Sequence, residues 1–170
     1  SGLTDADKET FSSKKADLGG ICTAAKTFGA KVHAYCNKYS QEDWAAELLY
    51  SIGKAQAAYD AVTWDDCWLG QTSTSNYKST ITEFDGYKQT VLTLTQNLNT
   101  VVANHKTKLK GNQPEITSMK GETQQVASKE VSPVNTAGNE AGGDLDSVIE
   151  KQGEIEQAVT GLAPHQESLD

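Results

Sequence analysis

The residues best suited to chemistry lie close together between positions 60 and 68. Asp60, Asp65 and Asp66 gather there with Trp64 and Trp68, the densest unusual cluster in the sequence. Carboxylate oxygens are ligands that Ca²⁺ accepts, and indoles are common in protein interfaces. The cluster therefore predicts a weak calcium site or a partner-binding site at the tip of a helical bundle. The alternative, which we favour, is a helix end at which the two indoles cover the core.

The three histidines, His33, His105 and His165, do not cluster along the chain. A catalytic histidine needs a nucleophile and an orienting acid beside it, and neither a G-x-S-x-G nor an H-E-x-x-H motif is present. The spacings of an EF-hand loop and of di-iron bundle ligands are also absent. We therefore expect no metal, no cofactor and no enzymatic activity, and we expect His105 to be a partly solvated residue of a helix seam.

The cysteines Cys22, Cys36 and Cys67 are the disulfide candidates. No two of them have C-x-x-C spacing, so zinc and thioredoxin-like motifs are absent. Cys22 and Cys36 lie on one expected helix, about 20 Å apart along its axis, which is too far to bridge without a break. Cys67 could instead meet one of them across a hairpin, with the third thiol buried or available to a second chain. A disulfide would favour a secreted protein.

The charge composition argues against two classes of partner. The net charge is −8, and all fifteen basic residues are lysine. An acidic surface repels phosphate backbones, and without arginine the chain lacks the planar, two-pronged group that recognises phosphate best. No apolar run reaches the roughly 18 residues that a membrane span needs. We therefore expect neither a nucleic-acid partner nor a membrane-spanning helix.

A long helix over residues 5–39 organises the predicted fold. Apolar side chains recur every seven residues, with a second set three residues later, which is typical of a helix packed along another helix: Phe11, Leu18, Ala25, Val32 and Tyr39, then Ile21, Phe28 and Tyr35. Lys14 interrupts this stripe at a position where an apolar residue is expected. Thr4 and Asp7 predict a capping box at the start. Gly19 and Gly20 indicate either a kink or, as we favour, the close approach of a neighbouring helix.

Two further helices are expected to pack along the first. A second runs from a cap at Ser40 to Gly70, with a polar turn over residues 71–76 and a third helix over about 77–110. Residues 90–101 partly alternate in polarity, as a strand would. Because the seven-residue repeat extends beyond them on both sides, we favour a helix there.

The C-terminal third has a weaker pattern. Residues 132–143 are the expected flexible interruption, a final helix is expected from Asp144, and the tail over residues 165–170 is expected to fray. All of this fits a single helical-bundle domain over residues 1–170. The predicted fold class is all-α, an elongated, coiled-coil-like antiparallel bundle of three to four long helices.

A long helical stripe without catalytic spacing favours a non-enzymatic protein that acts by protein–protein interaction or self-assembly. In size, acidity and seven-residue repeat, the chain is similar to long-helix surface-coat proteins and secretory-granule matrix proteins of protists. That resemblance implies a structural or binding protein in an extracellular or secretory compartment. The alternative is a carrier of an apolar small molecule or lipid between the helices. The six tyrosines suit either bundle packing or a binding surface.

Overall fold

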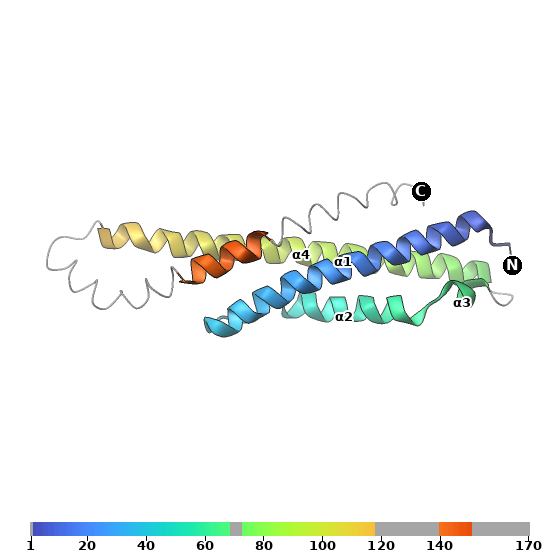
Figure 1. Cartoon of the computed structure of the whole chain (residues 1–170), viewed down its shortest axis with the longest axis horizontal. Helices are drawn as coiled ribbons and strands as arrows, with labels where there is room; N and C mark the ends of the chain where they lie inside the picture. Colours follow the sequence, from blue (N-terminus) through green and yellow to red (C-terminus); the bar gives the residue numbers. More distant parts are fainter. Residues whose placement is uncertain (1, 69–72, 118–139, 151–170) are drawn as a thin grey trace.

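The computed structural model describes residues 2–68, 73–117 and 140–150, and these residues form an elongated all-α bundle without strands (Figure 1). The labelled helices are α1 (Asp5–Lys38), α2 (Ala46–Ala61), α3 (Trp64–Trp68) and α4 (Ser73–Thr117). A further helix covers residues 140–150. The predicted fold class is confirmed.

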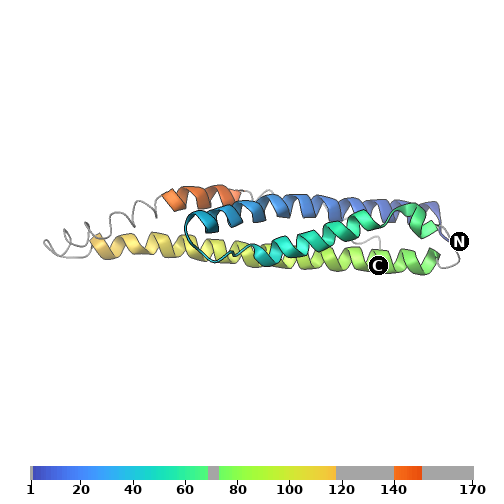
Figure 2. The same ribbon diagram turned by 90° about the horizontal axis from the view of Figure 1, so that it is seen from below.

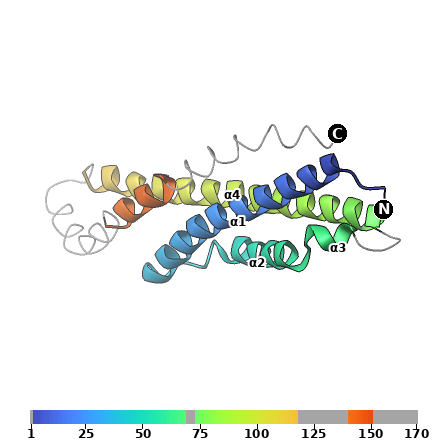
Figure 3. The same cartoon turned by 45° about the vertical axis from the view of Figure 1, so that its right-hand side comes forward.

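The helices run up, down and up again, so α1 and α4 lie parallel while α2 runs against both (Figures 1 and 2). Ring contacts set this alignment: Phe11 meets Phe84 near the start of α1 and α4, with their centroids 5.9 Å apart, and Tyr35 meets His105 further along. Helices α2 and α3 follow one another along one side of the bundle (Figure 3). Helix 140–150 lies beside the C-terminal half of α1.

The predicted start of α1 is confirmed. The Asp7 amide donates to the Thr4 hydroxyl at 3.2 Å, and the Thr4 amide donates to an Asp7 carboxylate oxygen at 2.8 Å, which is the reciprocal pattern of a capping box. The predicted seam is confirmed as far as Tyr35, since every member up to that residue is buried. In α4, Phe84, Val91 and Leu98 recur every seven residues and are buried. The repeat also places Val101 three residues after Leu98 in the seam, but Val101 is 40% exposed, and Val102 takes the buried position.

The interruption at Lys14 is one half of a charged layer between α1 and α4. The Lys14 ammonium donates to Asp85 Oδ1 at 2.8 Å, although Lys14 is only 2% exposed. One turn further on, Asp17 and Lys88 are also buried, at 6% and 3% exposure. Opposite charges therefore face each other at two successive levels of the seam, and this pairing favours one register of the two parallel helices.

The close approach expected at Gly19–Gly20 occurs at Gly19. A Cβ atom there would lie 2.9 Å from Cε2 of Tyr59 on α2, whereas a Cβ at Gly20 would meet nothing within 4 Å. Gly29 repeats the arrangement further along α1, since a Cβ there would lie 2.9 Å from Cδ2 of Leu49. Glycine therefore lets α1 and α2 approach closely at two levels.

The predicted boundaries of the second helix are wrong at both ends. Helix α2 begins at Ala46 rather than Ser40, because Ser40 takes a left-handed conformation with φ 54° and breaks the helix there. It ends at Ala61 rather than Gly70, because Val62 is extended and Thr63 starts a new helix. The segment expected to close the second helix is thus the separate helix α3. Gly70 lies outside the described residues.

Helix α4 is longer than the expected 77–110. It runs from Ser73 to Thr117, so the predicted end near residue 110 is wrong, and the expected turn over residues 71–76 is helical from Ser73 onward. Residues 90–101 are helical, as favoured. Three of their threonines hydrogen-bond inside the helix, because the hydroxyls of Thr90, Thr95 and Thr100 each donate to the backbone carbonyl four residues earlier, at 3.0, 2.7 and 3.2 Å.

The C-terminal expectations fall mostly outside the described residues. Residues 140–143, which precede the expected helix start at Asp144, are already helical. Of the expected flexible interruption, residues 140–143 are helical and residues 132–139 are not described. The end of the final helix and the tail over residues 165–170 are not described either.

Candidate protein-interaction site

The predicted tip cluster is divided among several structural roles. Trp64, half-buried, covers the end of the core, with its ring centroid 5.7 Å from that of Phe11 and 6.2 Å from that of Tyr77. This is the alternative favoured from the sequence for that indole. The side chain of Trp68 is outside the described part of the structure.

The three carboxylates of the predicted cluster have different structural roles. Asp66 caps α3: it accepts hydrogen bonds from the Thr63 amide at 2.7 Å and the Thr63 hydroxyl at 2.9 Å, and these bonds lower the pKa of its carboxyl group. Asp65 is exposed, and Asp60 is exposed on α2. Among the described residues, no group of three or more acidic, histidine or cysteine side chains has the geometry to hold a metal ion. A partner site at Asp60 and Asp65 stays a prediction.

The three cysteines are buried free thiols, so the expected disulfide is not formed in the structure. Burial raises the pKa of Cys22 to about 11 and also raises the pKa values of Cys36 and Cys67. The thiols lie at different levels of the bundle: Cys67 interacts with Thr80 near the start of α4, whereas Cys36 lies beside Trp44 at the opposite end. Cys22 lies between these levels. A raised pKa makes each thiol a poor nucleophile.

The site that the structure adds is the surface on which helix 140–150 lies. The helix buries Ala141, Leu145 and Val148, which are spaced four and three residues apart and therefore share one face. The opposite side of the contact is formed by the C-terminal half of α1 and by α4. We call this surface, marked by Lys31, Lys38, Tyr39 and Lys106, the docking face.

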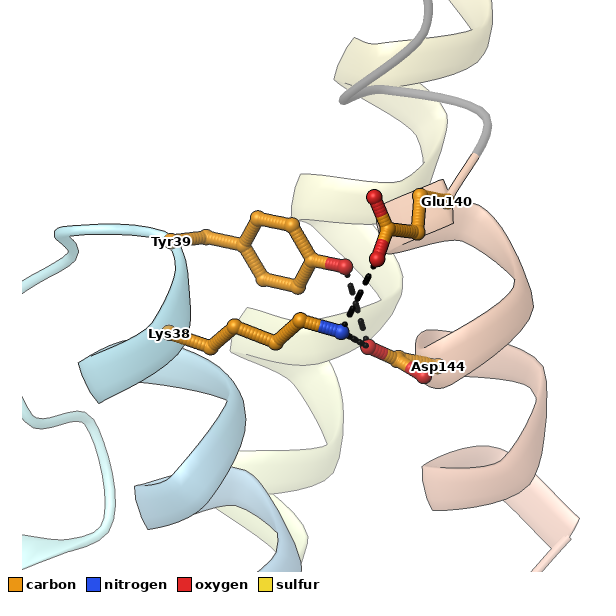
Figure 4. A network of polar contacts seen from close by, with 4 residues as sticks. All are labelled: Lys38, Tyr39, Glu140 and Asp144. Atoms are coloured by element: carbon orange, nitrogen blue, oxygen red, sulfur yellow. Dashed lines mark hydrogen bonds and ion pairs between the residues drawn. The ribbon is translucent and has the colours of Figure 1, made fainter.

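Polar contacts fix the start of helix 140–150 against the end of α1 (Figure 4). The Lys38 ammonium lies 3.1 Å from Glu140 Oε1 and 3.3 Å from Asp144 Oδ2, and the Tyr39 hydroxyl donates to the same Asp144 oxygen at 3.0 Å. The hydrogen bonds from Tyr39 and Lys38 lower the pKa of Asp144. The bond to Glu140 is the main cause of the raised pKa of Lys38.

Two more lysines hold the rest of the helix. Lys31 Nζ donates to Ser147 Oγ at 2.7 Å, and Lys106 on α4 forms an ion pair with Asp146. Between α1 and helix 140–150 lies a solvent-open pocket of about 230 Å³. It is lined by Lys31, Ala34, Tyr35, Lys38, Asp144, Ser147 and Val148. The helix is therefore held by lysines from both α1 and α4, and an open pocket remains beside it.

An aromatic cluster lies in the bundle next to the docking face. Tyr35 lies between Tyr39 and His105, with ring centroids 4.8 Å and 5.8 Å away, and Trp44 lies edge-on to His105 at 4.8 Å. His105 Nε2 and the Tyr35 hydroxyl are hydrogen-bonded at 2.9 Å. Burial, with a smaller contribution from Lys108, lowers the pKa of His105, and burial is the main cause that raises the pKa of Tyr35 to about 12. His105 is the partly buried seam residue expected from the sequence.

The sequence carried a signal for half of this site. Leu145, Val148 and Ile149 mark an apolar face flanked by acids, which predicts an amphipathic helix. Nothing in the local pattern says which part of the bundle that helix covers, and Lys38 and Lys106 are nearly seventy residues apart in the chain. Their convergence depends on the parallel packing of α1 and α4.

No protein family, curated protein or solved structure matches this chain. In the part of the chain that the structure describes, no helix combines the length and apolar character needed to cross a membrane. The function is therefore argued from the geometry of the bundle and its docking face.

Proposed function

We propose that this protein is a non-enzymatic helical bundle that acts by protein–protein interaction, and that the docking face is its binding surface. The observation that carries the proposal is the seating of helix 140–150 there. That contact combines three buried apolar side chains with lysine contacts from both α1 and α4. An amphipathic helix laid on an apolar surface with charged edges is a common mode of protein recognition.

A location in an extracellular or secretory compartment belongs to the same proposal, and its support is now narrower. The resemblance to surface-coat and granule proteins still favours it. The expected disulfide does not contribute, since all three thiols are free. The state of the cysteines can be checked by intact mass before and after alkylation of the denatured, unreduced protein. Modification of all three cysteines would show that the thiols are free.

The interaction can be tested by a photo-crosslinking amino acid at Ala34, which is exposed and lines the pocket beside helix 140–150. We expect covalent adducts of discrete, higher mass when the full chain is irradiated in extract of its source cells. The matched control is Gln89, which is exposed on α4 well away from the docking face. Equal adducts at both positions, or none at Ala34, would contradict the proposal.

A second candidate function, carriage of an apolar small molecule, is favoured by a groove of about 500 Å³ between α1 and α2. It passes Gly19, Gly20, Cys22 and Tyr59, but Asp60 and Gln56 also line it. A mostly apolar lining is usual for sites that take lipids, so this groove supports the carrier less well than the docking face supports a protein partner. Native mass spectrometry of the purified protein would show a co-purified lipid if the carrier function holds.

A further inference from the structure

We propose that helix 140–150 is an internal substitute ligand, and that the docking face binds an acidic amphipathic helix of a partner protein in its place. This inference rests on the proposed function and specifies the chemistry of the partner. The helix is acidic at Glu140, Asp144 and Asp146, and each of these carboxylates meets a lysine of the docking face. A partner helix with carboxylates at those spacings would satisfy the same lysines.

The charge of the docking face contrasts with the rest of the molecule. The whole chain carries a net charge of −8, yet Lys31, Lys38 and Lys106 converge on this one surface. Opposite charges across an interface speed association and exclude wrong partners. The surface therefore selects an acidic helix, and a basic helix would be repelled.

The internal helix leaves part of its own site uncovered. Its buried residues include the small Ala141, and Ser147 lines a pocket of about 230 Å³ that is open to solvent beside α1. Apolar atoms of such a pocket remain in contact with water, and covering them favours binding. A partner helix with a larger apolar residue at the position of Ser147 would cover this pocket and bury more apolar surface.

The internal helix is also weakly helical by itself. It contains Gly142 and Gly143, and each glycine in a helix interior costs about 1 kcal/mol relative to alanine. A Cβ atom at either glycine would meet nothing within 4 Å, so packing does not require glycine there. Replacing both with alanine should favour the docked helix without changing its contacts.

The competition can be measured with a fluorescent peptide of residues 140–150 in which both glycines are replaced by alanine. Its affinity for the full chain is set by the fraction of chains whose docking face is open. We expect the Leu145→Asp chain to bind the peptide at least ten-fold more tightly than the wild type. The substitution places a carboxylate at a buried position, and the cost of burying this charge releases the internal helix from the docking face. Asp144→Lys, which places a cation against Lys38, should act in the same direction.

The Gly142→Ala/Gly143→Ala chain is the matched opposite. We expect it to bind the peptide up to about five-fold more weakly for each glycine replaced, because the internal helix then competes better. A peptide with Ser147→Leu gives up the exposed hydrogen bond from Lys31 and gains apolar burial in the pocket, and we expect the net result to be an affinity a few-fold tighter. A peptide with Glu140→Lys, Asp144→Lys and Asp146→Lys should bind only the Lys38→Glu/Lys106→Glu chain. Circular dichroism of each variant checks that α1, α2 and α4 stay folded.

Two results would overturn the inference. One is equal peptide affinity for the Leu145→Asp, wild-type and Gly142→Ala/Gly143→Ala chains, and the other is no binding to either opened chain. A third result would be wild-type dimers that form with rising concentration and dissociate when the peptide is added. This result would identify a second copy of the chain as the occupant and would overturn the inference of a separate partner protein. If Ala34 cross-links to a partner but neither opened chain binds the peptide, the proposed function stands and only this inference is refuted.

Discussion

Lys14, Asp17, Asp85 and Lys88 place four formal charges in the seam between α1 and α4, and they are not equally satisfied. Lys14 and Asp85 form a hydrogen-bonded ion pair at 2.8 Å, and the Asp85 side chain is 37% exposed. Lys88 Nζ and Asp17 Oδ2, both buried, make no hydrogen bond within the described residues. A buried pair of this kind costs desolvation that its mutual attraction does not fully offset.

Replacing the unsatisfied pair with apolar residues should therefore stabilise the fold. We expect Asp17→Leu/Lys88→Met to raise the free energy of unfolding by about 1–4 kcal/mol. The single change Asp17→Leu should lower it by about 1–3 kcal/mol, because Lys88 then loses its attractive neighbour while staying buried. Urea unfolding of the three proteins measures both effects. A double variant less stable than the wild type would show that the attraction between Asp17 and Lys88 exceeds the cost of burying them.

The same lysine gives stability a dependence on pH. Burial, reinforced by repulsion from Lys14 and opposed by attraction to Asp17 and Asp85, lowers the pKa of Lys88 below its usual 10.5. Below that lowered value the folded chain bears the full cost of a buried charge. As the pH rises toward 10.5 the folded state releases this proton before the unfolded state does, so stability rises with pH in that window.

The expected outcome is that wild type gains stability relative to Lys88→Met between pH 7 and pH 10. Comparison with that variant cancels the contributions of the other titrating groups, including Tyr35. Unfolding midpoints at several pH values provide the measurement. A difference that stays flat across this range would mean that Lys88 is charged in the folded protein up to its ordinary pKa.

Adjacent glycines in α1 offer a matched pair of substitutions. Gly20→Ala places a methyl group in open space and should stabilise the protein by about 0.5–1 kcal/mol, the usual gain in helix propensity. Gly19→Ala should give no gain or a loss, since its Cβ would lie 2.9 Å from the Tyr59 ring. Thermal unfolding compares the two variants, and an equal gain for both would show that Tyr59 moves aside freely.

At the scale of elements, local capping decides where the helices end. The stripe Leu48, Ile52 and Ala55 correctly placed a second helix, and all three residues are buried. That spacing continues through Tyr59 to Val62, directly before Trp64, so the prediction joined α2 and α3 into one helix. Thr63 and Asp66 form a reciprocal cap that starts α3 anew. Periodicity finds the buried face of a helix, but it does not report a break that preserves that face.

The docking of helix 140–150 should depend on charge more than the packing of α1, α2 and α4 does. The ion pairs that Lys38 makes with Glu140 and Asp144 are exposed, with the Lys38 side chain 52% exposed, and exposed pairs are weakened by salt. We expect Lys38→Glu to speed amide hydrogen exchange in residues 144–150 several-fold, because it sets a third carboxylate against Glu140 and Asp144. Sodium chloride at about 0.5 M should have a smaller effect in the same direction.

Lys54→Glu on α2 is the control for that experiment, since Lys54 is an exposed lysine that lies over the Tyr50 ring and far from the docking face. Amides in the middle of α1 and α4 should keep their protection in both variants. Faster exchange in α4 as well would mean that helix 140–150 is an integral part of the bundle and not an exchangeable one.

At the scale of the whole molecule, the seven-residue repeat was enough to predict the architecture. Leu18, Phe28, Phe84 and Val91 all lie in the core where the repeat places them. The docking face was not predictable in this way. It depends on contacts such as Lys106 with Asp146 and Lys38 with Asp144, which join distant parts of the chain. A local pattern shows that a face is apolar or charged, but not what it meets.

Helix α4 is the longest of the described elements, and its length gives a prediction for the shape in solution. Its 45 residues extend about 68 Å at 1.5 Å per residue. A rod of that length has a radius of gyration of about 20 Å, whereas a compact globule of 170 residues would have about 15 Å. We expect small-angle scattering of the full chain to give at least the larger value.

The Leu145→Asp chain provides the internal comparison, because releasing helix 140–150 leaves the length of α4 unchanged. Its radius of gyration should therefore be equal to or larger than that of the wild type, in low and high salt alike. A decrease toward 15 Å in either protein would mean that α4 bends back on the bundle, and the parallel packing that brings Lys38 and Lys106 to one surface would then be lost in solution.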